Sequence, residues 1–136
     1  MKWTVLAVGR MRPPFADDAQ HFQRLLTRQA RVEIVEVADE EAVARRLPRD
    51  AFVSLLDAGG EAMGSEAFAR WLEARRQGGR DVCFVIGGAY GITLDHGVDH
   101  RLSLGPFTLP HQLARVVLLE QLFRGHKILA GEPYHH

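Results

Sequence analysis

The sequence has a single cysteine, no excess of charge of either sign and no long apolar run. Cys83 alone cannot form a disulfide within the chain, which is typical of a protein in a reducing compartment. Lys plus Arg and Asp plus Glu both number 17, so the basic excess that holds nucleic acid by charge alone is missing. No run approaches the roughly 20 apolar residues that cross a membrane, and the start lacks a signal-peptide pattern. We therefore expect a soluble, cytoplasmic protein without a membrane partner.

The composition that remains is that of an ordinary globular domain. Of the 136 residues, 46% are hydrophobic and 25% are charged. There is no internal repeat and no Ser-, Gly- or Pro-rich linker, which favours a single domain over residues 1–136. Basic residues gather toward the two ends and acidic residues in the middle. That distribution fits one positive face, but composition alone favours a scattered, solvated surface.

The pattern of apolar residues predicts an α/β fold with about five mostly parallel strands and helices on both faces. Two segments are almost continuously apolar, which is typical of strands covered on both sides. The last helix, opened by Pro110, carries an apolar set too wide for one face, so a second subunit is a natural partner. The expected strands cover residues 2–8, 32–37, 51–56, 82–86 and 102–104, and the expected helices cover 16–30, 39–47, 65–77 (with Ser65 as N-cap) and the segment from 110.

Three of these strands end in loops that favour close approach of a ligand to the backbone: residues 56–60, 87–91 and 104–110. Parallel sheets bind ligands at the carboxyl ends of their strands, so the three loops predict one pocket. The string GGAYG is neither a dinucleotide fingerprint nor a P-loop, and each loop taken alone also fits plain turn chemistry. An adenosyl ligand without phosphates is compatible with such loops, but the pattern does not identify the ligand.

Longer strings in the second half of the chain are more specific. FVIGGAYGI, LSLGPFTLPHQLARVVLLEQLFR and the final PYHH closely resemble the RlmH family, the bacterial large-subunit ribosomal RNA pseudouridine N3-methyltransferases of the SPOUT class. The resemblance is dense over residues 51–136 and looser over 1–37. It is weakest at 38–50, where this chain is shorter than many members.

The resemblance implies a SPOUT-type fold with a deep C-terminal trefoil knot, one of the rare exceptions to unknotted topology. It implies an enzyme that uses S-adenosyl-L-methionine to methylate N3 of a pseudouridine in 23S rRNA, on the assembled ribosome, as a homodimer. Another knotted methyltransferase acting on tRNA, or a non-catalytic ribosome-associated RNA-binding dimer, are the alternatives. By similarity, the cofactor is held by Leu56, Gly87, Leu104, Gly105, Pro106, Phe107, Thr108 and Leu109.

The resemblance also points to the C-terminal tail as the source of catalytic groups. The acceptor nitrogen must lose a proton, so His135 is the candidate base and Tyr134 a candidate contact to the nucleobase. His111, Arg115 and His136 are candidates for binding RNA, and the first two also for orienting the site. Many members follow Tyr-His with Lys or Arg, whereas this chain ends in His136.

Each of these residues also has a purely structural interpretation. His111 fits a structural histidine, Arg115 and Arg124 fit ion pairs with Glu120 on one helix face, and a terminal Tyr-His-His fits a frayed end. His96 and His100 have the spacing of two metal ligands on a helix, but Gly97 interrupts that helix and no third ligand is evident. We therefore expect no metal.

Overall fold

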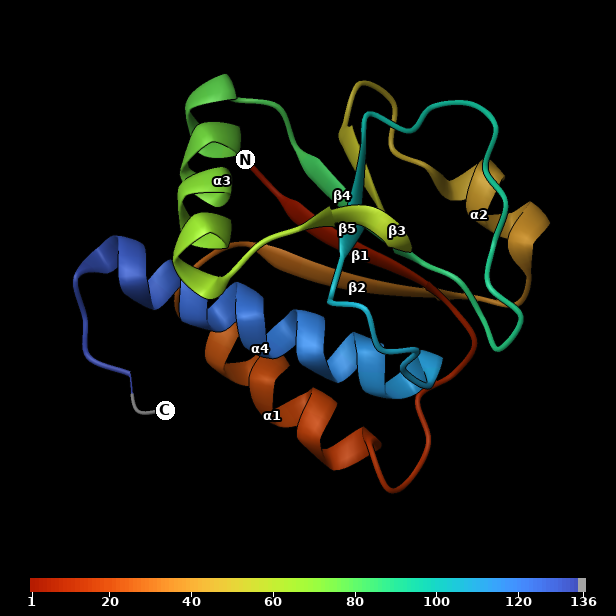
Figure 1. Cartoon of the computed structure of the whole chain (residues 1–136), viewed down its shortest axis with the longest axis horizontal. Coiled ribbons are helices and arrows are strands. Elements are labelled where there is room, and N and C mark those ends of the chain that lie inside the picture. The colour runs from red at the N-terminus through yellow and green to blue at the C-terminus, as the bar shows by residue number, and fades with distance from the viewer. Residues whose placement is uncertain (135–136) are drawn as a thin grey trace.

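A five-stranded parallel sheet forms the centre of the computed structural model, which describes residues 1–134 (Figure 1). The strand order is β2-β1-β4-β3-β5, and every neighbouring pair is parallel. The carboxyl ends of all strands therefore lie at the same edge of the sheet. The strands are β1 (Trp3–Val8), β2 (Val32–Val37), β3 (Phe52–Ala62), β4 (Val82–Ile86) and β5 (His100–Ser103).

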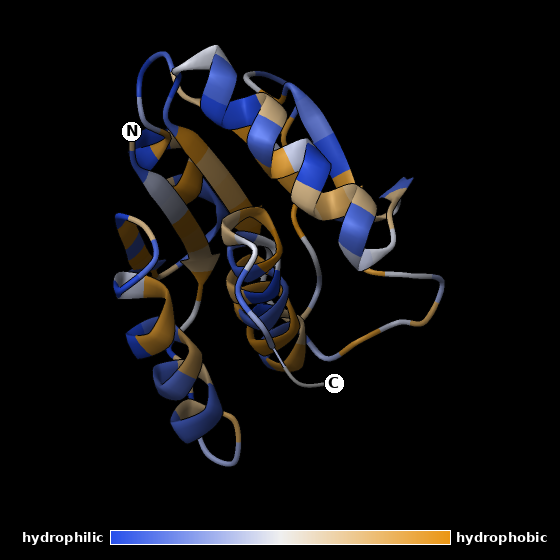
Figure 2. Ribbon diagram, turned by 90° about the vertical axis from the view of Figure 1, so that its left-hand side faces the viewer, coloured by the Kyte–Doolittle hydropathy of each residue, from blue (hydrophilic) through white to orange (hydrophobic). Residues whose placement is uncertain are grey.

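Helices cover both faces of the sheet. One face carries α1 (Ala16–Thr27), α3 (Ser65–Gly78) and α4 (His111–Ala130), and the other carries α2 (Glu40–Arg46) together with the connection 87–99. In Figure 2 the apolar strands lie between helices of mixed polarity. The predicted α/β class, with parallel strands and helices on both faces, is confirmed.

Successive side chains of the central strands point to opposite faces of the sheet, so the core consists of two clusters, one on each face. Trp3, Val5 and Ala7 of β1 face α1, α3 and α4, whereas Leu6 faces the side of α2. Every residue of β4 is buried, as its continuous apolar sequence predicts. The α4 helix contributes Leu118, Leu119, Leu122 and Phe123 to the larger cluster.

The α4 helix also carries apolar side chains that this core does not fully cover. Leu113, Val116 and Val117 are only half buried, and Ile128 is exposed. The breadth of its apolar set is therefore confirmed. Among residues 1–134, no helix is both long and apolar enough to span a bilayer.

Three local predictions are wrong. The strand expected to end at residue 56 continues to Ala62 through an irregularity between Leu56 and Glu61, because residues 61 and 62 pair with β5. Gly60 permits this pairing, since a Cβ there would lie 2.6 Å from the carbonyl carbon of Arg101. The N-cap of α3 is Gly64, and the Ser65 hydroxyl instead donates to Gln121 on α4. The first helix ends at Thr27 instead of residue 30.

Candidate functional site at the strand ends

An open pocket lies where β3, β4 and β5 end. It is built from the bulge of β3, the loop after β4, and the loop after β5 with the first turn of α4 that follows it, so three segments distant in sequence converge on it. Its lining is formed by Leu56, Asp57, Ala58, Ile86, Gly87, Gly88, Gly91, Ile92, Leu102, Leu104, Gly105, Phe107, Thr108, Leu109, His111 and Ala114.

The structure brings nearly all of the predicted cofactor residues together. Every one of them lines this pocket except Pro106. His111, which we expect to hold RNA or orient the site, lies in the same lining at the start of α4. Phe107 is largely exposed at the edge of the pocket, with 82% of its surface accessible.

Sequence reasoning missed four apolar lining residues: Ile86, Ile92, Leu102 and Ala114. Ile86 and Leu102 lie in strands β4 and β5, and Ala114 lies one helical turn after His111. The only signal in the sequence was their position next to the three predicted loops. Apolar strand residues are most often core, so that signal does not separate a lining residue from a packed one.

The glycines of the second loop are needed for its shape. Gly91 has a φ of +78° and donates from its amide to the carbonyl of Gly88 at 2.9 Å, which closes a tight turn. A Cβ on Gly87 would lie 2.7 Å from the carbonyl carbon of Gly91. Only glycine at position 87 lets the loop fold back so closely, so this residue shapes the wall of the pocket.

The one carboxylate in the described lining is Asp57, which forms an ion pair with Arg101 at 3.1 Å. A hydrogen bond from the Gly59 amide (2.9 Å) and one from the Arg101 guanidinium (3.1 Å) lower the pKa of Asp57 below its ordinary value. Asp57 is therefore ionised at neutral pH. No lysine or arginine occurs among the described residues that line the pocket. This environment suits a neutral or cationic ligand better than a phosphate.

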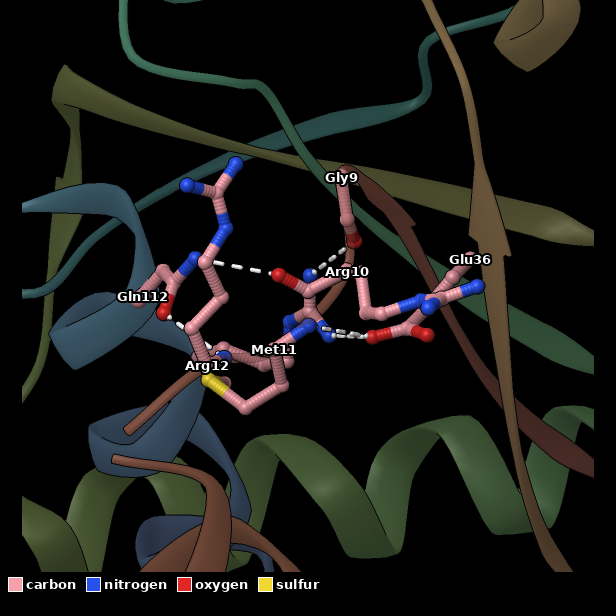
Figure 3. A network of polar contacts seen from close by, with 7 residues as sticks. Gly9, Arg10, Met11, Arg12, Glu36 and Gln112 are labelled. Carbon is pink, nitrogen blue, oxygen red and sulfur yellow. Dashed lines mark hydrogen bonds and ion pairs between the residues drawn. The ribbon is translucent and has the colours of Figure 1, made fainter. Parts of the chain in front are cut away.

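Arg115, one helical turn after His111, points away from the solvent. Only 2% of its surface is exposed. Its guanidinium forms an ion pair with Glu36 at the end of β2 and donates to the carbonyl of Gly9 at 2.8 Å (Figure 3). Direct contact with RNA does not fit this burial, whereas orientation of neighbouring segments does. Pairing with Glu120 is wrong for Arg115 but confirmed for Arg124.

The same network holds the loop after β1. The Gln112 side chain donates to the carbonyl of Arg10 and accepts from the amide of Arg12, both at 3.0 Å, and Glu36 accepts from the amide of Met11 at 2.8 Å. Burial alone would raise the pKa of Glu36, but the bonds from Met11 and Arg115 outweigh it and lower that pKa. The Glu36 carboxylate is therefore ionised and compensates the charge of the buried Arg115 guanidinium.

Tyr134, a predicted catalytic residue, does not lie in the pocket of its own chain. Its hydroxyl donates to Glu120 at 2.9 Å, and its ring packs edge-on against Phe123 with the Arg124 guanidinium over its face. Glu120 lies about 14 Å further along α4 than the pocket residue His111, at 1.5 Å per residue. The predictions for His135 and His136 fall outside the described residues.

Other titratable groups have structural partners. The two ring nitrogens of His100 form hydrogen bonds with the Ser54 hydroxyl (2.9 Å) and the Glu61 carboxylate (2.8 Å). These bonds connect the edge strand β5 to β3. Residues 93–99 are not helical, so His96 and His100 do not share a helix face. Within residues 1–134, no group of three or more His, Cys, Asp or Glu is arranged to hold a metal. Burial raises the pKa of the Cys83 thiol to about 12, so it is unreactive.

A parallel sheet with a backbone-rich pocket at the ends of three neighbouring strands defines a class: α/β proteins that bind a small organic ligand at that edge. Comparison with known families is more specific. The family model described as "Predicted SPOUT methyltransferase" matches residues 1–135. The chain belongs to the SPOUT methyltransferase family.

Several curated proteins similar to this chain carry the name "Ribosomal RNA large subunit methyltransferase H". The protein of that name from Rubrobacter xylanophilus is 46% identical over 152 positions, covering 97% of this chain and 96% of the relative. Those from Acidiphilium cryptum (42%; 96% and 91% covered) and Gemmatimonas aurantiaca (39%; 99% and 99% covered) are also similar. Each alignment is longer than the 136 residues of this chain, so it includes positions that the chain lacks.

Proposed function

We propose that this chain transfers a methyl group from S-adenosyl-L-methionine to N3 of a pseudouridine in 23S rRNA of the assembled ribosome, in the cytoplasm. One observation carries the proposal: the pocket that collects the predicted cofactor residues belongs to a SPOUT methyltransferase whose full-length relatives are named as ribosomal RNA large-subunit methyltransferases.

The residues of the pocket fit such a cofactor. Leu56, Leu104 and Leu109 offer apolar walls for an adenine ring, and the bulge and loops offer backbone N–H and C=O groups for its edge. Asp57 supplies an anionic group for a ligand that carries a positive sulfonium. The absence of Lys and Arg from the described lining agrees with a ligand that has no phosphate.

Bound S-adenosylmethionine supplies an activated methyl group, so the protein's own work is alignment and proton removal. Leu104 through Leu109 and Gly87 hold the donor at the strand ends. His111 lies in the same lining and orients the acceptor. The acceptor N–H must be deprotonated, and we assign this step to His135, with Tyr134 contacting the nucleobase.

Placement of Tyr134 on its own α4 supports a tail that serves the pocket of a second chain in a homodimer. The half-buried Leu113, Val116 and Val117 and the exposed Phe107 and Tyr90 offer apolar surface for such a partner. We further propose that the segment after β5 is threaded through the chain as the C-terminal trefoil knot. The return of α4 to the face of the sheet opposite the connection 87–99 supports that path.

The test is transfer of labelled methyl groups from S-adenosylmethionine to assembled ribosomes, protein-free rRNA and tRNA in parallel. We expect label in ribosomes, at one pseudouridine after nuclease digestion and mass spectrometry. Label in tRNA alone would instead support a tRNA methyltransferase. Calorimetric binding of S-adenosylhomocysteine without any label in RNA would support a non-catalytic RNA-binding dimer, and absence of binding would contradict the pocket assignment.

A further inference from the structure

The loop that joins β1 to α1, residues 9–14, presents two arginines to solvent beside the pocket. Arg10 and Arg12 are both exposed, and none of the ion pairs formed within residues 1–134 includes either of them. Glu36 is the carboxylate near Arg10, but it is already bonded to Arg115 and to the Met11 amide. Both guanidinium groups therefore remain accessible to a ligand, while the charge of Arg10 also helps to lower the pKa of Glu36.

The backbone of this loop is held at four successive residues. Arg115 binds the carbonyl of Gly9, Gln112 binds the carbonyl of Arg10 and the amide of Arg12, and Glu36 binds the amide of Met11. Figure 3 shows that these contacts are made from α4 and β2, while the side chains of Arg10 and Arg12 leave the loop in different directions. Glu36, Gln112 and Arg115 build this frame, and neither of the two loop guanidinium groups forms an ion pair in it.

The loop also adjoins the pocket on two sides. Gly88, a lining residue, lies so close to β1 that a Cβ there would be 3.2 Å from a methyl carbon of Val8, the residue before the loop. Gln112, whose side chain forms two hydrogen bonds with the loop backbone, directly follows the lining residue His111 in α4. Figure 1 shows the chain passing the N-terminal end of α4 as it leaves β1.

We infer that residues 9–14 form a phosphate-binding subsite for the RNA substrate, in which Arg10 and Arg12 bind the RNA backbone and Gln112 and Arg115 are positioning residues. The inference rests on the proposed RNA substrate. Arginine binds phosphate oxygens through paired N–H groups. A loop already fixed through its backbone loses little entropy when its side chains bind. A chain with no net charge needs such a local site, because its overall charge does not attract RNA.

The first experiment compares the double variant Arg10→Ala/Arg12→Ala with Arg28→Ala/Arg31→Ala. The control pair removes the same charge from exposed positions between α1 and β2, at the opposite edge of the sheet. For Arg10→Ala/Arg12→Ala we expect KM for ribosomes to rise about tenfold or more, and the slope of log affinity against log salt to fall by about 1 per arginine. The affinity of this variant for S-adenosylhomocysteine stays unchanged. The control pair changes neither KM for ribosomes, nor the salt slope, nor the affinity for S-adenosylhomocysteine. Equal KM and salt slope in the two pairs would overturn the inference.

The second experiment tests whether Gln112 acts through the arginines. Gln112→Met keeps the length of the side chain but removes both bonds to the loop, and we expect it to raise KM for ribosomes severalfold with little change in kcat. In the Arg10→Ala/Arg12→Ala background the same substitution raises KM no further. An effect of equal size in both backgrounds would mean that Gln112 supports the fold alone and would overturn its role as a positioning residue.

Two readouts separate this subsite from the proposed function. If the unaltered protein labels no RNA, the proposed function fails, whatever the variants do. If it labels ribosomes, binding of Arg10→Ala/Arg12→Ala to protein-free 23S rRNA is measured by filter retention. Weaker binding than in the control pair supports the inference. A defect seen with ribosomes but not with protein-free rRNA would assign the two arginines to a ribosomal protein and would overturn it.

Discussion

Arg115 on α4 and Glu36 at the end of β2 form an ion pair between residues 79 positions apart in the sequence. The two partners differ in burial: the Arg115 side chain is 3% exposed, whereas that of Glu36 is 37% exposed. Glu36 therefore keeps part of its hydration, but Arg115 depends on Glu36 and the Gly9 carbonyl for compensation of its charge. The pair links the helix that begins at the pocket to the loop after β1.

This difference predicts unequal effects of breaking the pair from its two sides. Glu36→Gln leaves a guanidinium buried with its charge uncompensated, and we expect a loss of about 3 kcal/mol in the free energy of unfolding. Arg115→Met leaves a half-exposed carboxylate that water can solvate, so the expected loss is smaller, about 1–2 kcal/mol. Urea unfolding measures both. Glu33→Gln on the same strand, whose carboxylate is 53% exposed in a surface pair with Lys2, serves as control. A larger loss for Arg115→Met would contradict this account.

A second prediction concerns pH and His126, which is buried on α4. Burial lowers the pKa of His126 from its ordinary value of 6.5, because the hydrogen bond from its Nδ1 to the Leu122 carbonyl does not offset desolvation of the imidazolium. The folded state then binds fewer protons than the unfolded state. The contribution of the neutral imidazole is thus complete above pH 6.5 and is lost as the pH falls from 6.5 through the folded pKa.

The measurement is the free energy of unfolding between pH 7.5 and pH 5 for the unaltered protein and for His126→Phe, which preserves the edge-on contact with Trp3. We expect the stability of the unaltered protein to fall more steeply with acidification than that of His126→Phe. His21→Phe, at an exposed position of α1, retains the full slope. Parallel curves for all three proteins would show that the imidazole of His126 titrates alike in the folded and unfolded states.

The elements that sequence alone predicts well are those whose pattern is local. The alternation in residues 32–37 and the continuous apolar run in 82–86 give the bounds of β2 and β4 as the structure has them. The pocket was predictable because parallel strands bring their carboxyl ends to one edge, so three loops far apart in sequence had to meet.

Contacts between distant residues were not predictable in this way. The pairing of Arg115 with Glu36 depends on how α4 is placed against the end of β2, and an arginine five residues before Glu120 suggests the wrong partner. The extension of β3 depends on a close approach of Gly60 to Arg101, for which a glycine pair after a strand gives no distinct signal. The contact of Tyr134 with Glu120 depends on the end of α4 at Ala130, where Gly131 caps the helix with a φ of +68°.

A third prediction tests the shape of the pocket wall. Gly87→Ala places a methyl group 2.7 Å from the backbone of Gly91, which must move and open the turn. We expect at least a tenfold loss of affinity for S-adenosylhomocysteine in calorimetry, equivalent to about 1.4 kcal/mol. Gly78→Ala, near the end of α3, meets nothing within 4 Å and should bind as the unaltered protein does. Unchanged binding in Gly87→Ala, with the fold intact by circular dichroism, would remove this loop from the cofactor site.

The last prediction asks which chain's tail serves which pocket. Because Tyr134 is bound to Glu120 on its own α4, we expect catalysis to require the tail of the second chain. Gly87→Ala weakens the pocket and His135→Ala disables the tail, so at an S-adenosylmethionine concentration well below the Kd of the Gly87→Ala pocket each homodimer should be nearly inactive. A heterodimer of the two, purified through different tags, combines an intact pocket with an intact tail from the other chain. It should recover about half of the activity of the unaltered dimer, since one of its two equivalent sites is complete.

The reverse combination gives the opposite result. A chain carrying both substitutions, paired with an unaltered chain, leaves the intact pocket facing the disabled tail, and this heterodimer should be inactive. If each tail served its own pocket, the unaltered chain would remain active and the first heterodimer would not. Because the two combinations contain the same substitutions in the same number, a difference in folding does not explain opposite activities. The comparison therefore reports only on the path of the tail between the two chains.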